Sequence, residues 1–264
     1  MKKNINNIFN LFLVSHVVIW TLIPFFSNKN LPLDVIEALA WGSNLDWGFT
    51  KHPPLSAFFS EFFYQIFGSQ DWAYYLLSQL FIIFSFFVIF KLSREFLKNE
   101  NYALISVFLL EGIYFYNFTT PEFNVNICQI PFWSLTIYYA WQSFKSDKIH
   151  CWIFLGLFAA LGVLSKYLFI YLLVGIKLFF IYYLSKKNKL NYKYFISIIV
   201  FILVLSPHFI WLVENDYRTI AYGLKRTSLE ASTFLDHFFY PIKFILKQII
   251  ILSPFFLLLS LIIK

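Results

Sequence analysis

Long apolar runs, separated by short polar segments, make up most of the chain. A membrane-spanning helix needs about 20 apolar residues, because about 30 Å of hydrocarbon is crossed at 1.5 Å per residue. The pattern predicts eight such helices, at residues 8–26, 72–93, 102–118, 124–143, 151–165, 167–184, 194–213 and 241–263. The chain is therefore expected to be an all-α membrane protein with about eight transmembrane helices in a single domain, residues 1–264.

The fifth and sixth apolar runs are separated by Lys166 alone. They could form one long helix with a buried lysine, or two short helices in a tight hairpin. We expect the hairpin, because the 34 residues from 151 to 184 are too many for one ordinary span.

The polar segment 27–71 contains two shorter helical patterns. Asp34, Glu37 and Trp41 recur at i, i+3 and i+7, which places them on one helical face. Residues 55–67 are too short and too polar to span, and they predict an amphipathic helix in the membrane interface with aromatic residues on its buried side. Pro53-Pro54 should separate the two helices.

Composition supports a membrane protein. The chain is 59% hydrophobic and 13% charged, whereas a soluble domain has about 25% charged residues. The net charge of +7 could suggest nucleic acid, but the basic residues lie between apolar runs, where they orient a membrane protein. We expect membrane lipids, and no nucleic acid, as partners.

The distribution of charge predicts an orientation. If the N-terminus is cytoplasmic and all eight helices cross, the cytoplasmic side has 12 basic and three acidic residues, and the other side has eight basic and ten acidic. Because cytoplasmic loops are enriched in Lys and Arg, this orientation is favoured. The protein should lie in the cell (inner) membrane, with segments 27–71, 119–124 and 214–240 outside the cytoplasm.

The first extracytoplasmic segment contains the strongest candidate chemistry. Asp34 and Glu37 could share a divalent cation, or one could act as a general base that the other tunes; alternatively, they form an ordinary solvated helix face. Lys51-His52, held by Pro53-Pro54, could bind a phosphate. The alternative is a lysine that snorkels at the interface.

Further candidates follow along the chain. Glu122 and Asn126 are spaced at i and i+4 and could face one cavity, while Thr119 or Thr120 could cap a helix that starts at Pro121. Lys166 could be a phosphate ligand or a turn residue. A polar, partly basic group near the end of the seventh run is more simply explained as a solvated loop; it comprises His208, Glu214, Asp216, Arg218, Lys225 and Arg226.

These motifs resemble those of a known family. The most specific are Leu-Asp-x-x-Glu-Ala-Leu-Ala-Trp-Gly at 33–42 and Trp-Gly-Phe-x-Lys-His-Pro-Pro-Leu at 47–55, and a less specific one begins Ser-Pro-His-Phe-Ile-Trp at 206. Over about residues 8–226, the chain resembles the bacterial dolichyl-phosphate-mannose–protein mannosyltransferase-like family, which includes the lipid A aminoarabinose transferases.

The resemblance implies a glycosyltransferase of the GT-C type, a hexosyl or pentosyl transferase. It would move a sugar from a polyprenyl-phosphate carrier to an extracytoplasmic acceptor, such as lipid A, a glycan or a protein. Asp34 matches the family's catalytic acidic residue, as general base or metal ligand, and Lys51-His52 falls where members place a basic residue against the lipid-linked phosphate. Many members have a second acidic residue, an aspartate, where this chain has Asn126, and Glu122 lies one turn earlier. A neutral amide cannot act as a base, so either Glu122 takes the catalytic place of that aspartate or this subgroup works differently.

Two alternatives are open. Family members are often much longer, so the chain is expected to lack the C-terminal part of longer relatives, and it could be an inactive truncated remnant. It could also be a transporter or flippase for lipid-linked sugars. A transporter should have ionisable residues near mid-membrane, where only Glu111 and Lys177 are candidates, which favours the enzyme.

Overall fold

The protein is built from helices alone in the residues that its computed structural model describes, which are 2–187, 191–227 and 233–262. This confirms the all-α class. The helices are α1 (Lys2–Ser27), α2 (Leu33–Gly42), α3 (Leu55–Phe67), α4 (Asp71–Phe96), α5 (Glu100–Phe108), η1 (Leu109–Gly112), η2 (Tyr114–Tyr116), α6 (Val125–Ser146), α7 (Ile149–Ser165), η3 (Tyr167–Phe169), α8 (Ile170–Lys187), α9 (Lys193–Glu214), α10 (Arg218–Thr227) and α11 (Asp236–Ile262).

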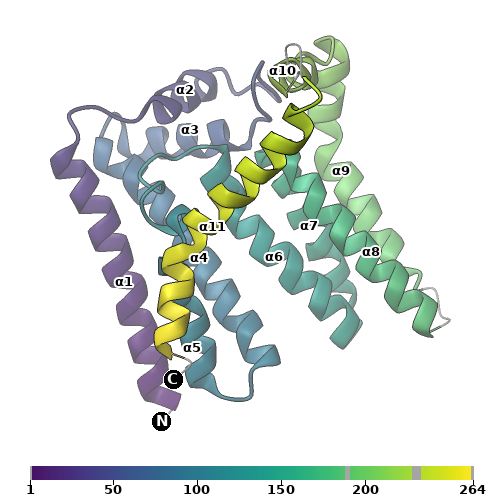
Figure 1. The fold of residues 1–264 in the computed structure, drawn as a ribbon. Helices are drawn as coiled ribbons and strands as arrows, with labels where there is room; N and C mark the ends of the chain where they lie inside the picture. The colour runs from purple at the N-terminus through teal and green to yellow at the C-terminus, as the bar shows by residue number, and fades with distance from the viewer. Residues whose placement is uncertain (1, 188–190, 228–232, 263–264) are drawn as a thin grey trace.

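The long helices run back and forth between two ends of the molecule (Figure 1). One end carries α2, α3 and α10, and the other carries the N-terminus and the turn between α4 and α5. The expected extracytoplasmic segments therefore meet at one end, as the predicted orientation requires. Which side of the membrane this end faces remains a prediction.

Four described helices are long and apolar enough to cross a membrane: Asn4–Ser27, Asp71–Phe96, Lys193–Glu214 and Asp236–Ile262. Ile149–Ser165 and Tyr167–Tyr183 are apolar but shorter. The count of eight spans therefore stays a prediction. The last helix begins at Asp236 rather than 241, and residue 263 of the expected run lies outside the described residues.

The expected helix at 102–118 is wrong as one continuous element, because α5 ends at Phe108 and two 3-10 turns follow. Side chains hold this break in place. Glu111 Oε1 lies 2.7 Å from His16 Nδ1 in α1, and Asn117 Nδ2 donates to the Glu111 carbonyl at 2.7 Å. The segment thus satisfies polar groups through side chains instead of a regular helical ladder.

Lys166 separates two helices, as expected. Its backbone is extended (φ −161°, ψ 132°), so α7 cannot continue through it. A Cβ on Gly162 would lie 2.3 Å from the Phe169 ring, which places the end of α7 against the start of the next segment. Trp152, early in α7, has its ring 5.7 Å from that of Phe180, late in α8. The two helices are therefore antiparallel.

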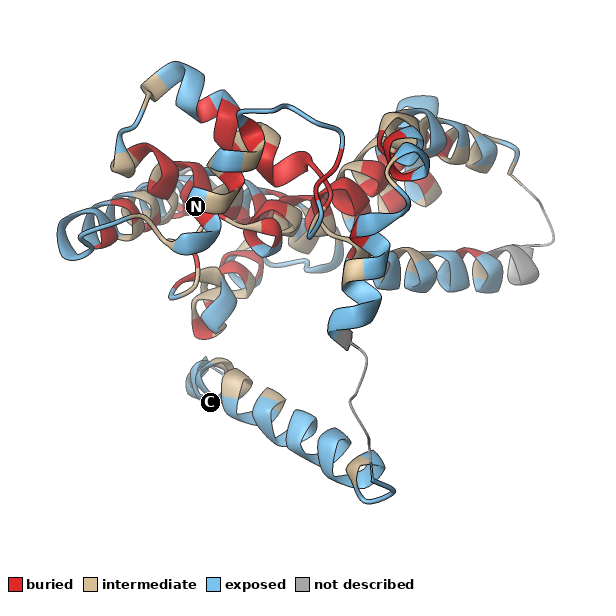
Figure 2. Cartoon of the chain, turned by 90° about the horizontal axis from the view of Figure 1, so that it is seen from above, coloured by how far each residue is buried: buried red, intermediate tan, exposed pale blue. Residues whose placement is uncertain are grey.

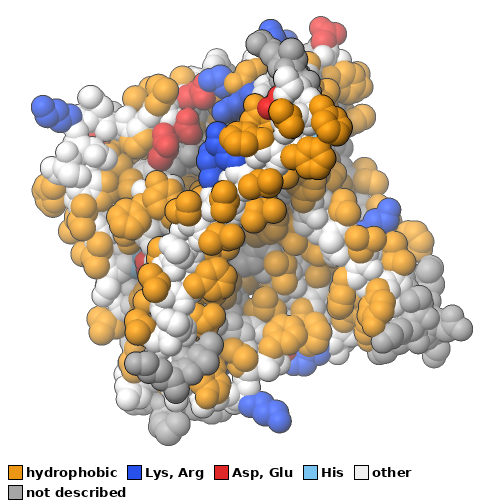
Figure 3. Space-filling view, viewed as in Figure 1, with side chains coloured by type: hydrophobic (Ala, Val, Ile, Leu, Met, Phe, Trp, Pro, Cys, Tyr) orange, Lys and Arg blue, Asp and Glu red, His pale blue; other side chains and the backbone are white. Residues whose placement is uncertain are grey.

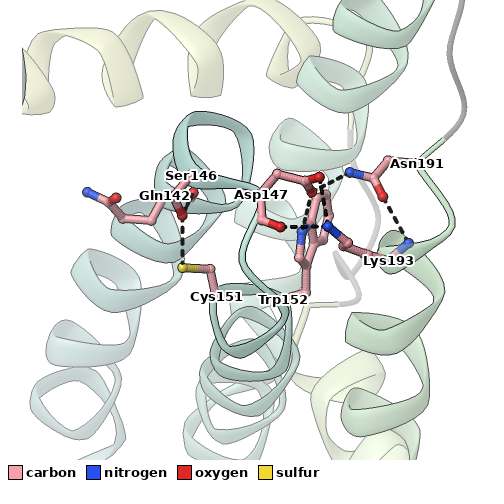
Figure 4. A network of polar contacts seen from close by, with 7 residues as sticks. All are labelled: Gln142, Ser146, Asp147, Cys151, Trp152, Asn191 and Lys193. Atoms are coloured by element: carbon pink, nitrogen blue, oxygen red, sulfur yellow. Dashed lines mark hydrogen bonds and ion pairs between the residues drawn. The ribbon is translucent and has the colours of Figure 1, made fainter.

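A polar network fixes the opposite end of the bundle, where the turn between α6 and α7 meets the start of α9 (Figure 4). Lys193 Nζ donates to the Asp147 carbonyl at 2.7 Å and to its Oδ2 at 2.8 Å. Asn191 Nδ2 and Trp152 Nε1 both donate to Asp147 Oδ1. Along the same helices, a Cβ on Gly156 would lie 2.3 Å from the α9 backbone, so α7 and α9 pack very closely.

Helices α2 and α3 lie where the polar segment predicted them, with Pro53-Pro54 between them. The expectation that the aromatic residues of α3 lie on its membrane-buried side stays a prediction, and the side that packs against the protein has a different composition. Its buried positions are mostly small or polar residues that face the protein, including Ala57 and Glu61, because α2 approaches closely: a Cβ on Gly42 would lie 2.7 Å from the Ala57 carbonyl oxygen. Phe63 is buried, whereas Phe62 is exposed.

Helix α11 lies on the outside of the protein, with none of its described residues buried (Figure 2). It meets the body at η1, where a Cβ on Gly112 would lie 2.6 Å from the Phe255 Cα. Its apolar side chains are otherwise exposed, as expected of a helix that faces lipid.

Candidate functional site

The acidic candidates meet where the start of α2 lies against the segment before α6. The Asp34 backbone N–H donates to Glu122 Oε1 at 3.2 Å. It is one of the N–H groups in the first turn of α2 that have no partner within the helix. Asp34 Oδ2 accepts from Asn124 Nδ2 at 3.0 Å. A cavity of about 530 Å³ opens beside this junction, and it is lined by Asp34, Phe115, Thr119, Glu122, Asn124, Asn126, Ile127, Gln129 and Ile130.

Glu122 and Asn126 line the same cavity, as predicted, but not through a shared helical face. Helix α6 begins at Val125, so Glu122 lies before it. The N-cap is Asn124, whose Oδ1 accepts from the backbone N–H groups of Asn126 and Ile127 at 2.9 and 3.3 Å. The expected cap at Thr119 or Thr120 is therefore wrong; Thr120 Oγ1 donates instead to the Asn117 carbonyl at 2.6 Å.

Glu37 and Lys51 form an ion pair at the edge of this junction. Lys51 Nζ donates to Glu37 Oε1 at 2.5 Å. This hydrogen bond and the Glu37 charge raise the pKa of Lys51 above its ordinary value. Lys51 is therefore a fixed cation whose charge is already partly balanced by a neighbouring carboxylate.

His52 is partly buried, and its ring packs edge-on against Trp41 with centroids 6.0 Å apart. Burial, followed by the positive charge of Lys166, holds the pKa of His52 below its ordinary value. Glu37 and Asp34 oppose this shift, and Arg226 adds to it. His52 is thus neutral at pH 7, so the Lys51-His52 pair carries one positive charge rather than two.

Lys166 is hydrogen-bonded to the wall of the cavity. Its Nζ donates to Asn126 Oδ1, a neutral amide oxygen, at 2.5 Å. Burial and the nearby positive charge of Arg226 lower the pKa of Lys166. Two cations held near each other, one of them partly buried, form an environment that favours an anion.

Acidic and basic side chains gather on one face at this end of the molecule (Figure 3). The carboxylates come from α2 and from the segment before α6, whereas Lys166 and Arg226 come from the α7–η3 turn and from α10. The charges of both groups shift the pKa of His52. Asp34, Glu37, Glu122, Lys51, His52, Asn126 and Lys166 are therefore brought together at one end, and their chemical roles stay predictions.

Several residues of this region were not recognised from the sequence. Arg226 was assigned to a solvated loop, but α10 places its charge near Lys166 and His52. His208, at the end of the seventh run, is expected on a polar, solvated face with that loop, yet only 1% of its surface is exposed. The Ser-Pro-His motif in an apolar run was the one available signal, because a histidine in such a run needs polar partners.

The carboxylates do not complete a metal site from protein side chains. Within residues 2–187, 191–227 and 233–262, no group of three or more His, Cys, Asp or Glu residues could hold a metal ion. Glu37 is already paired with Lys51. A divalent cation shared by Asp34 and Glu37, with remaining ligands from substrate or water, stays a prediction.

Comparison with known proteins supplies the family. Residues 51–211, more than half of the chain, match the model of the dolichyl-phosphate-mannose-protein mannosyltransferase family. The chain belongs to this family. It is therefore a membrane glycosyltransferase of the GT-C type. The match includes Lys51, His52, Glu122, Asn126 and Lys166, and it begins after Asp34 and Glu37.

Searches of curated proteins and of solved structures find no match.

Proposed function

We propose that this mannosyltransferase-family protein moves a sugar from a polyprenyl-phosphate carrier to a hydroxyl group of an extracytoplasmic acceptor. The observation that carries the proposal is the arrangement of charge around one cavity. Asp34 and Glu122 line that cavity, and Lys166 is bonded to Asn126 in its wall. A reaction that needs a base and releases a phosphate requires these two kinds of group side by side.

In the proposed step, the acceptor oxygen bonds to the anomeric carbon of the sugar. The bond between that carbon and the carrier phosphate oxygen breaks, and the phosphate leaves with the bonding electrons. The acceptor proton passes to Asp34, whose carboxylate is positioned by Asn124. Lys166 and Arg226 would stabilise the negative charge that develops on the leaving phosphate.

Glu122 has a different proposed part. Its Oε1 accepts the Asp34 backbone N–H, so it holds the first turn of α2 over the cavity. A carboxylate at a helix N-terminus is also favoured by the helix dipole. We propose that Glu122 holds Asp34 in position and adds negative charge to the cavity. An uncharged acceptor rich in hydroxyl groups would fit beside these carboxylates better than a phosphate.

The test is transfer from lipid-linked sugars in membranes that contain the protein. Undecaprenyl-phosphate hexoses and pentoses would be supplied, and release of undecaprenyl phosphate measured. Asp34→Asn should lower the rate by about 10² to 10⁴, the usual effect of losing a general base. Asp46→Asn is the matched control, because Asp46 is exposed and its Oδ1 accepts only the local Trp47 N–H among the described contacts.

Equal rates for Asp34→Asn and wild type would sink the catalytic assignment. Movement of intact lipid-linked sugar across vesicle membranes, without release of undecaprenyl phosphate, would favour the transporter or flippase instead. Absence of both activities would favour an inactive remnant. Addition of a chelator to the same assay tests the predicted divalent cation.

A further inference from the structure

His208 connects the loop before Lys51-His52 to the turn that carries Lys166, one of the two cations of the proposed phosphate site. It lies in α9 and is 1% exposed. Its Nδ1 is 2.6 Å from the Trp47 carbonyl oxygen, and its Nε2 is 2.7 Å from the Tyr167 hydroxyl. Trp47 precedes Lys51-His52 by a few residues, and Tyr167 directly follows Lys166.

The two contacts define the proton arrangement on the ring. A carbonyl oxygen can only accept, so Nδ1 must carry the proton and donate it to Trp47. In the neutral ring, Nε2 then accepts from the Tyr167 hydroxyl. Both ring nitrogens are thereby used, and His208 is left with no polar atom for a substrate. Its function must be exerted through the groups that it holds.

The loop that contains Trp47 is also docked on α9 and α10 at the next two residues. A Cβ on Gly48 would lie 2.3 Å from the Trp211 ring, so the loop backbone lies directly on that ring. The Phe49 carbonyl accepts from Thr219 Oγ1 at 2.5 Å, and Thr219 is 2% exposed. The Phe49 N–H in turn donates to the His52 carbonyl at 3.1 Å, which closes the turn that carries Lys51-His52.

We infer that His208 is a positioning residue that sets the spacing between the Lys51-His52 turn and the Lys166-Tyr167 turn, and so shapes the site for the lipid-linked phosphate. This inference rests on the proposed function. A buried bridge can hold such a spacing because each end is a hydrogen bond that would be costly to leave unmade. Thr219 provides a second polar route between the same segments, because it donates to the Phe49 carbonyl and is hydrogen-bonded to Tyr167. Loss of His208 should therefore loosen the spacing rather than disconnect the two segments.

The test is binding of undecaprenyl phosphate to the purified full chain in detergent, with undecaprenol as the uncharged probe. His208→Phe keeps a ring but removes both hydrogen bonds, and Tyr167→Phe removes one hydroxyl and leaves His208 in place. Each lost bond should weaken phosphate-lipid binding by about two- to ten-fold, while undecaprenol binding stays unchanged. Trp152→Phe is the matched control, because it likewise removes one partly buried hydrogen bond, to Asp147, at the opposite end of the bundle.

The outcomes separate the inference from the proposed function. Preference for the phosphate lipid in wild type and Trp152→Phe, reduced in both other variants, supports the inference. If His208→Phe does not fold, Tyr167→Phe alone decides. Folded variants that bind undecaprenyl phosphate as wild type does would overturn the positioning role and leave the proposed function standing. No preference for the phosphate lipid in wild type would overturn both.

Discussion

Replacement of Lys166 by methionine should have opposite effects on the free protein and on the protein with its donor. In the free protein, burial and Arg226 lower the Lys166 pKa, so the charged form is disfavoured by folding at neutral pH. Its bond to Asn126 is with a neutral amide. Lys166→Met keeps the aliphatic chain, and the extended backbone of this residue suits any side chain. The thermal unfolding temperature in detergent should therefore not fall.

With the donor bound, the same change would remove the proposed charge-assisted hydrogen bond between Lys166 and the carrier phosphate. Such a bond contributes about 1.5 to 3 kcal/mol, and each 1.4 kcal/mol is about a factor of ten. The apparent KM for a lipid-linked sugar should rise by about 10- to 150-fold.

Two control variants accompany this measurement. Lys166→Arg should retain most of the donor affinity, and Lys177→Met, an exposed lysine of α8, should retain all of it. An unchanged KM in folded Lys166→Met would refute the reasoning.

Three further predictions concern pH, loop docking and the opposite end of the bundle. The pKa of His52 is lowered in the free protein, and a bound phosphate would raise it, so donor binding should be accompanied by uptake of a proton. The KM for the donor should therefore fall as pH falls from about 8 to about 6. His52→Gln should weaken this dependence of KM on pH. Gly48→Ala places a Cβ against Trp211 and should lower stability by about 1 to 3 kcal/mol, seen as a lower unfolding temperature that Gly175→Ala, with nothing within 4 Å, does not show. Hydrogen bonds from Lys193 and Asn191 lower the pKa of Asp147. The ionised Asp147 therefore contributes about 1 kcal/mol to the free energy of unfolding at a pH above its unfolded-state pKa, and this contribution is lost as pH falls below about 4. Asp147→Asn, which tolerates the positive φ of 50°, should remove that pH dependence of the unfolding temperature.

The helical elements near the site were predictable because their signals are local. The spacing of Asp34, Glu37 and Trp41 predicts α2, and Pro53-Pro54 predicts its separation from α3. The break at Lys166 follows from the length of the apolar run. The failure at 102–118 has a non-local cause, because the 3-10 turns are held by His16 of α1, which lies 95 residues away from Glu111 in sequence.

Which polar groups meet could not be read from any local pattern. Lys166 and Asn126 are 40 residues apart, and His208 and the Trp47 carbonyl are 161 apart. Such pairs exist only once whole helices have packed together; α7 and α9, for example, approach so closely that a side chain at Gly156 would collide with the α9 backbone. Pairing of this kind depends on how whole helices pack, and the spacing of residues along one helix does not predict that packing.

The sequence by itself determined the all-helical membrane class and the position of α2 and α3, and it named seven of the polar residues that the structure brings to one end. The length of an apolar run and the periodicity of polar residues depend only on residues that are close in sequence, so both can be recognised without knowledge of the fold. Only the tertiary structure decided that Lys51 is paired with Glu37, that burial and Lys166 lower the pKa of His52, and that Lys166 lies near Arg226. It also decided the bridge through His208. Charge state and partnership depend on burial and on distant neighbours, and both exist only once the helices have packed.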